Sequence, residues 1–194
     1  MPGRTTYEAW ESYVAPMNKA LACIAQHQRF VVKELTSGLD PEQEYSVTLN
    51  DMNSVPLSSS PRIYLVAGQT IRLYEWHPNI AAEHFRVQAL SYIYAFTTKI
   101  NEKEVDLLTF EWRRDPGEDY RHPHGHMHVG PAVLNPRSTV RPGSFHKAHI
   151  PTDRLSFESV VRFAIDELNV KARNKEWQTV LAASEAKFEE HKTS

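Results

Sequence analysis

The ten histidines of this 194-residue chain are unevenly placed, and their spacing is the clearest chemical signal in the sequence. Six of them lie between residues 121 and 154: His122, His124, His126, His128, His146 and His149. Within the run 124–128 histidine alternates with other residues, so in an extended strand the three imidazoles project from one face, with neighbours roughly 6.5–7 Å apart. That spacing allows the rings to converge on one reactant or one ion.

Converging imidazoles can do two kinds of chemistry. A divalent metal ion, such as zinc or manganese, can bind two or three of them and keep one position open for water. Without a metal, a neutral histidine accepts a proton while a protonated neighbour donates one, which the near-neutral pKa of imidazole permits. For both kinds the candidate residues are His124, His126, His128 and His149. A metal shell could be completed by His146 or by an acid of the preceding loop, Glu118 or Asp119.

Positive charge gathers in the same segment. Residues 121–154 contain five Arg or Lys and one acid, so they carry +4, whereas the whole chain carries −2 and the remainder −6. A basic patch on an acidic body attracts anions, of which phosphates are the commonest. The candidate substrate- and phosphate-binding residues are Arg113, Arg121, Arg137, Arg141, His146 and Lys147. The alternative is that these charges are solvated loop residues and that His122, whose register Pro123 interrupts, is structural.

The run His124-Gly125-His126-Met127-His128-Val129-Gly130 resembles the histidine-triad motif of nucleotide hydrolases and transferases. In that family, alternating histidines place a nucleophilic imidazole against an α-phosphate. The resemblance implies that His126 is the nucleophile.

A second resemblance covers roughly residues 63–152. The order of features is an aromatic alternating strand at 92–96, a strand that ends in arginine within 110–115, a short polar loop and a histidine-rich strand. This order is similar to that of the small histidine-containing toxins of TumE-like toxin–antitoxin pairs. The resemblance implies an RNA-directed activity and an antitoxin as partner.

From these features we expect a histidine-dependent phosphodiesterase, a ribonuclease or nucleotide-processing toxin or defence effector that acts on RNA or a nucleotide. One alternative is a hydrolase with a histidine-bound divalent ion and a non-nucleotide substrate. Another is a non-catalytic module that binds nucleic acid or a protein through the basic segment 121–154. The C-terminal apolar stripes could form the surface of a homodimer or bind another partner, and packing on the sheet explains them equally well.

Composition excludes several classes. The single cysteine, Cys23, excludes an intramolecular disulfide and a Cys-x-x-Cys metal or redox site. No run of about 18 apolar residues occurs, so we expect no membrane partner, and the first residues lack the apolar stretch of a secretion signal. The expected location is therefore the cytoplasm.

The two ends of the chain have helical periodicity. Thr5 and Glu8 form a capping box before apolar residues that recur every three and four positions, and Pro16 predicts a kink or a division into two short helices. Two more amphipathic helices are expected behind the typical N-cap residues Ser156 and Asn174.

Between these helices the apolar period is two, which is typical of strands. Gly68-Gln69 is expected to be a tight turn between two short strands. Residues 86–99 are apolar on both faces, which predicts a central strand, and the polar turn at 101–103 predicts an antiparallel hairpin with 105–112.

The sequence thus predicts an α+β fold: an N-terminal helix, a largely antiparallel central sheet and two C-terminal amphipathic helices packed on one face. A length of 194 residues fits one domain spanning residues 1–194. Its expected parts are an N-terminal helical segment (1–28), a sheet with histidine-rich loops (30–150) and a C-terminal helix pair (155–194).

Overall fold

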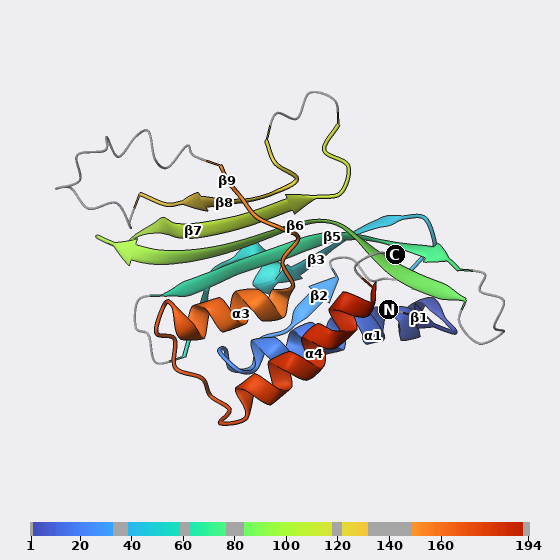
Figure 1. Ribbon diagram of the computed structural model, residues 1–194, viewed down its shortest axis with the longest axis horizontal. Helices are drawn as coiled ribbons and strands as arrows, with labels where there is room; N and C mark the ends of the chain where they lie inside the picture. Colours follow the sequence, from blue (N-terminus) through green and yellow to red (C-terminus); the bar gives the residue numbers. More distant parts are fainter. Residues whose placement is uncertain are drawn as a thin grey trace.

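The computed structural model describes residues 2–32, 39–58, 63–76, 84–117, 122–131 and 149–191. Within these ranges the chain forms a β-sheet with helices beneath it (Figure 1). The strands are β1 (Pro2–Gly3), β2 (Phe30–Val32), β3 (Glu44–Leu49), β4 (Val55–Pro56), β5 (Tyr64–Glu75), β6 (Phe85–Ile100), β7 (Lys103–Arg113), β8 (Gly125–Val129) and β9 (Ile150–Pro151). The helices are α1 (Thr6–Leu21), α3 (Phe157–Asp166), α4 (Trp177–His191) and the 3₁₀ helix η1 (Asn50–Met52).

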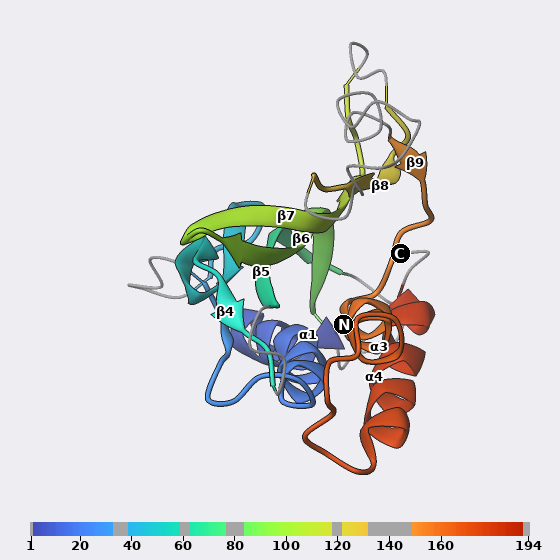
Figure 2. The ribbon, with the colours of Figure 1, turned by 90° about the vertical axis from the view of Figure 1, so that its left-hand side faces the viewer.

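The strands lie in the order β2-β3-β5-β6-β7-β8-β9, with β1 beside β6 and β4 beside β5. Every described strand pair is antiparallel. Helices α1, α3 and α4 lie together on one face of the sheet, which we call the helix face, and the other is called the open face (Figure 2). This arrangement confirms the α+β class predicted from the sequence. None of the described helices is long and apolar enough to cross a membrane.

The predicted central strand is confirmed as β6, which pairs with β5 on one side and β7 on the other. The β6–β7 hairpin turns at Asn101 and Glu102, whose φ angles of 50° and 62° are left-handed. A two-residue turn with positive φ at both positions matches the twist of its strands. The hairpin therefore sets the register of β7 with β6, and β7 in turn pairs with β8.

One local prediction was wrong, and at Pro16 one of the two predicted alternatives is excluded. Gly68 is not in a turn, because β5 runs without interruption through it and pairs it with Thr48 and Ile93. A Cβ at Gly68 would lie 2.5 Å from the Met52 sulfur, so here glycine permits a close approach inside a strand. Pro16 does not divide the N-terminal helix, since α1 continues through it to Leu21, while the predicted Thr5 cap is confirmed.

Aromatic side chains join α3 to the sheet. Phe157, at the first residue of α3, lies edge-on to Tyr94 of β6 with ring centroids 5.4 Å apart, and edge-on to Phe30 of β2 at 4.9 Å. Phe163, six residues later, contacts Phe110 of β7 in the same way at 5.5 Å. Buried aromatic pairs of this geometry stabilise beyond the apolar area they bury. These aromatic contacts fix the position of the start of α3. They thereby also fix the end of the segment that connects β9 to α3.

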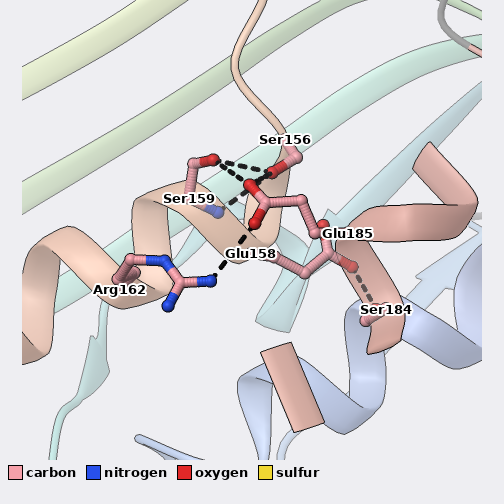
Figure 3. Close-up of polar contacts among 6 residues, drawn as sticks. All are labelled: Ser156, Glu158, Ser159, Arg162, Ser184 and Glu185. Carbon is pink, nitrogen blue, oxygen red and sulfur yellow. Dashed lines mark hydrogen bonds and ion pairs between the residues drawn. The ribbon is translucent and has the colours of Figure 1, made fainter. Parts of the chain in front are cut away.

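A polar network joins α3 to α4 (Figure 3). Ser156, the predicted cap of α3, accepts a hydrogen bond from the Ser159 N–H at 3.0 Å. The Glu185 carboxylate of α4 accepts hydrogen bonds from both serine hydroxyls and lies 3.2 Å from the Arg162 guanidinium. Beside it, the Ser184 hydroxyl donates to the buried Glu158 carboxyl. The two C-terminal helices are thus held together by polar contacts as well as by their apolar stripes.

Candidate metal centre

Strand pairing places two histidines on the open face of the sheet. In the β7–β8 pair, His126 lies opposite Glu111 and His128 opposite Thr109. Directly opposed residues of an antiparallel pair have their side chains on the same face. The alternate residue Met127 packs on the core, so His126 and His128 project away from it.

The third histidine is brought to the same place by β9. Ile150 and Pro151 pair with Met127 and His126, and the Thr152 N–H donates a hydrogen bond to the Gly125 carbonyl at 2.9 Å. A Cβ at Gly125 would lie 2.6 Å from the Thr152 carbonyl oxygen. Glycine at 125 therefore permits the close approach that carries His149 to the edge of β8.

His126, His128 and His149 form the described group with metal-binding potential, which we call the histidine cluster. Each offers one ring nitrogen, and the three nitrogens lie within 4.8 Å of one another. The ring centroid of His149 is 4.3 Å from that of His128 and 4.8 Å from that of His126. Nitrogens that bind one tetrahedral zinc at 2.0–2.1 Å are roughly 3.3 Å apart from one another. If the rings rotate so that each nitrogen moves by roughly an ångström, the three can bind one ion.

His126 is oriented for such a role. Its ring is 1% exposed, and its Nδ1 lies 3.0 Å from the Pro123 carbonyl oxygen. A carbonyl only accepts, so Nδ1 carries the proton and Nε2 of the neutral ring keeps a lone pair. Histidines that bind metals typically donate a hydrogen bond from the ring nitrogen that does not bind the ion, and this bond fixes the tautomer. The Glu111 Oε2 atom lies 3.8 Å from this Nε2.

His149 contains a buried nitrogen whose partner is not among the described residues. Its Nδ1 is inaccessible to solvent and has no hydrogen-bond partner within the described ranges. A buried polar atom without a partner calls for an explanation such as an ion or an ordered water. This nitrogen is therefore a candidate for binding a metal ion or an ordered water.

The surroundings of His128 and His149 favour the neutral form of these two rings. Burial lowers the pKa of His128 from the ordinary value of 6.5, and the Glu111 carboxylate partly opposes this effect. Burial, followed by the neighbouring histidines, also lowers the pKa of His149. A histidine must be neutral to bind a metal, so both shifts keep lone pairs available at mildly acid pH.

The structure brings together some of the residues predicted from the sequence and separates others. His124, in contrast to its neighbours in the alternating run, lies before β8 with an exposed side chain and is not part of the histidine cluster. Arg113 is on β7, two residues after Glu111, so it shares the open face. The other predicted phosphate-binding residues lie outside the described residues: Arg121, Arg137, Arg141, His146 and Lys147. The same holds for Glu118 and Asp119.

Two residues of the site were missed by reasoning from the sequence. Glu111 lies opposite His126 because of the register of β7 with β8, which the sequence did not indicate. An acid between Phe110 and Trp112 in an otherwise apolar strand was the one signal that could have marked it as a functional residue. His122 was expected to be structural, yet its ring stacks on that of His149. No pattern within residues 121–128 indicated that contact, because it joins residues far apart in the sequence.

Comparison of the chain with protein-family models, with curated proteins and with solved structures found no match.

Proposed function

We propose that His126, His128 and His149 bind one divalent metal ion and that the protein is a metal-dependent hydrolase of phosphodiesters. The observation that carries the proposal is the convergence of three ring nitrogens within 4.8 Å on the open face of the sheet, two from β8 and one from the residue before β9. Two further observations support it: the orientation of His126, and the buried Nδ1 of His149, which has no hydrogen-bond partner among the residues that the structure describes.

Three imidazoles are a donor set typical of catalytic zinc, and imidazole also suits iron, nickel and copper. A metal bound by three protein ligands keeps a position for water, lowers the pKa of that water and neutralises charge on a phosphoryl oxygen. Among these ions we favour zinc, because the described cluster consists of three imidazoles and has no carboxylate ligand.

Glu111 is the proposed general base. Its carboxylate lies 3.8 Å from the His126 Nε2, and the side chain is 38% exposed, so water can reach it. A carboxylate beside a metal-binding nitrogen can accept a proton from water as the water attacks phosphorus. Glu111 would then hold that proton until the leaving oxygen takes it.

The open face beside Glu111 supports a phosphodiester as substrate. A groove of about 290 Å³ there is lined by Glu111 and Arg113 together with hydroxyl side chains of Ser46, Thr70 and Ser91. A second groove of about 410 Å³ shares Arg113, Thr70 and Ser91 and extends to Arg114. It also contains Asp115 and the ion pair of Arg72 with Glu44. Guanidinium groups bind phosphate oxygens through paired hydrogen bonds. The +4 charge of residues 121–154 points to the same class of substrate.

Metal content tests the first half of the proposal. Protein purified without a histidine tag should contain about one metal ion per chain, measured by mass spectrometry of the metal. The double variant His126→Ala/His128→Ala should lose the ion, whereas His84→Ala, which removes an exposed histidine before β6, should keep it. Wild-type protein that neither contains metal nor binds added zinc, manganese or iron would contradict the proposal.

Turnover tests the second half. The metal-loaded protein should hydrolyse bis(p-nitrophenyl) phosphate or single-stranded RNA, and should hydrolyse p-nitrophenyl acetate poorly. Turnover of the ester alone would instead support a metal-dependent hydrolase with a non-nucleotide substrate. Salt-dependent binding of RNA without any product would support a binding module.

A metal-free phosphodiesterase is the second candidate. The pKa values of His128 and His149, both lowered from the ordinary 6.5, favour it, because a neutral imidazole can act as a general base. The two candidates separate cleanly: full turnover of RNA after complete removal of metal by a chelator would support the metal-free reaction and contradict the metal-dependent one.

A further inference from the structure

A row of directly paired residues crosses the open face from the histidine cluster. His126 of β8 lies opposite Glu111 of β7. Glu111 lies opposite Ile93 of β6, and Ile93 opposite Gly68 of β5. Neighbouring strands are about 4.8 Å apart, so the Gly68 backbone lies roughly 10 Å from that of Glu111. Residues paired in this way share one face of the sheet, so the row leads from the histidine cluster to the middle of the open face.

The open face is hollow beside this row because the residues there are small. Gly68 has no side chain, and the neighbouring row consists of Ser91, Thr70 and Ser46, which pair across β6, β5 and β3. All four line the groove of about 290 Å³, which we call the Met52 groove after another of its lining residues. A cavity of about 150 Å³ on the same measure holds benzene, so the Met52 groove has room for a two-ring system.

Met52 supplies an apolar wall of this groove. Its side chain packs on Gly68, where a Cβ would lie 2.5 Å from the Met52 sulfur, yet the residue is still 38% exposed. The turn η1 holds it there with φ angles of 48°, 51° and 64° at Asn50, Asp51 and Met52. Left-handed backbone is unfavourable for residues other than glycine, and such strain gathers at sites that bind ligands. A thioether also makes favourable contacts with aromatic rings, so Met52 is suited to contact a planar ring.

Hydroxyl groups supply the polar part of the lining. Ser46, Thr70 and Ser91 can each donate one hydrogen bond and accept two. None of these three hydroxyls is hydrogen-bonded to another residue of the described ranges. The edges of nucleobases carry both donors and acceptors, and serine or threonine can pair with either kind. Apolar walls with a few polar groups are the usual form of a small-molecule site, and here they match the faces and the edge of a nucleobase.

We propose that the Met52 groove binds a nucleobase of the substrate, so that the phosphodiester at the histidine cluster belongs to a nucleotide or an oligonucleotide. The ring would lie over Ile93 and against Met52, and its edge would meet the hydroxyls of Ser91 and Thr70. The sugar would then span the sheet from the groove toward Glu111. The identity of the diester rests on the proposed function, whereas the affinity of the groove for a base requires neither metal nor turnover.

Titration with adenosine, followed by NMR, tests this proposal separately from hydrolysis. It is performed on the wild-type chain and on the double variant His126→Ala/His128→Ala, which lacks two of the proposed metal ligands. Ribose, which has the sugar without the base, is the matched ligand control. We expect saturable adenosine binding to both proteins with a Kd below about 1 mM, and at least ~10-fold weaker binding of ribose.

Three results would overturn the proposal. They are no saturable binding of adenosine up to about 5 mM, equal binding of ribose, and binding to the wild-type chain alone, which would place the base on the metal. Failure of the proposed hydrolase is a different outcome: the protein would bind adenosine without cleaving any diester. Conversely, loss of the adenosine site would leave the metal content unchanged.

Variants locate the site. Met52→Ala removes the thioether and should weaken adenosine binding about 2- to 10-fold. Ile100→Ala, at an apolar residue that is also exposed and ends β6, is the matched control and should leave the affinity unchanged. Ser91→Leu should weaken binding at least ~10-fold, because the added carbons would occupy the groove, and it keeps the test decisive if Met52→Ala does not fold. Circular dichroism checks folding. Unchanged adenosine affinity in either folded variant, Met52→Ala or Ser91→Leu, would show that the base binds elsewhere.

Discussion

The imidazole of His122 lies flat against that of His149, with ring centroids 3.5 Å apart and 19° between the ring planes. The same His122 ring is 6.0 Å from His126. Residues 122 and 149 therefore meet at the histidine cluster although 26 residues separate them in the sequence. The stack covers one side of a proposed metal ligand, and this position suggests that His122 supports His149 rather than binding the ion itself.

Replacement of His122 separates these two roles. Phenylalanine keeps a flat ring for stacking but has no nitrogen, so His122→Phe should bind zinc nearly as tightly as wild type. His122→Ala loses the ring that supports a ligand, and such losses weaken metal affinity by roughly 10- to 100-fold. Competition with a zinc chelator measures both affinities. If the Phe and Ala variants lose affinity equally, His122 is a ligand.

Glu111→Gln tests the proposed general base. The amide keeps the size of the side chain and cannot accept the proton, so kcat on a phosphodiester should fall by about 10²- to 10⁴-fold. Metal content should stay the same, because the three imidazoles are unchanged. Glu102→Gln, in the exposed β6–β7 turn, is the matched control and should retain activity. A loss of metal in Glu111→Gln would instead make Glu111 a ligand.

Gly125→Ala tests how the site is held together. The new Cβ would meet the Thr152 carbonyl at 2.6 Å, and backbone atoms there have little freedom to move. We expect a destabilisation of about 1–3 kcal/mol and weaker metal binding, because β9 and His149 must shift. Gly68→Ala is the matched control, since its Cβ would meet only the end of the Met52 side chain, which can rotate away. Urea unfolding measures both. Equal effects of the two substitutions would contradict this account.

The carboxyl pair of Figure 3 predicts opposite pH dependences. Burial raises the pKa of Glu158 above its ordinary 4.5, so as pH rises past 4.5 the unfolded chain releases this proton first and stability falls. Glu158→Gln removes that effect, and its stability relative to wild type should therefore increase from pH 4.5 upward.

Glu185 has the opposite sign. Burial opposes its ionisation, but hydrogen bonds from Ser159 and Ser156 and the Arg162 guanidinium lower its pKa below 4.5. Its ionised form contributes stability above pH 4.5, and that contribution is lost as pH falls through the lowered pKa. Glu185→Gln should thus be destabilised near neutral pH and approach wild type in acid. Urea unfolding of both variants between pH 4 and 8 measures the two trends, and parallel trends would contradict them.

Much of the fold could be predicted because its signals are local. A period of two with apolar residues on both faces indicated the central strand β6, and polar residues at 101–103 indicated its turn. Cap residues Thr5 and Ser156 marked the starts of α1 and α3. Gly68 was predicted to be in a turn, but glycine is needed there because the Met52 side chain packs closely against it. Met52 comes from another part of the chain, so local sequence did not indicate this contact.

The candidate site was only partly predictable for the same reason. Alternation within a strand correctly indicated that His126 and His128 share a face. It could not indicate that His124 lies outside the strand, or that Glu111 stands opposite His126. Those relations depend on where β8 begins and on its register with β7.

By itself, the sequence determined the candidate groups and the fold class: imidazoles in a basic segment, a single cysteine at Cys23, and an α+β fold. Only the tertiary structure decided which histidines meet. Side-chain direction along a strand follows from backbone geometry, which is local, whereas the approach of His149 to His126 requires β9 to pair with β8 across more than 20 residues. Long-range pairing of this kind is set by packing of the whole sheet on its helices.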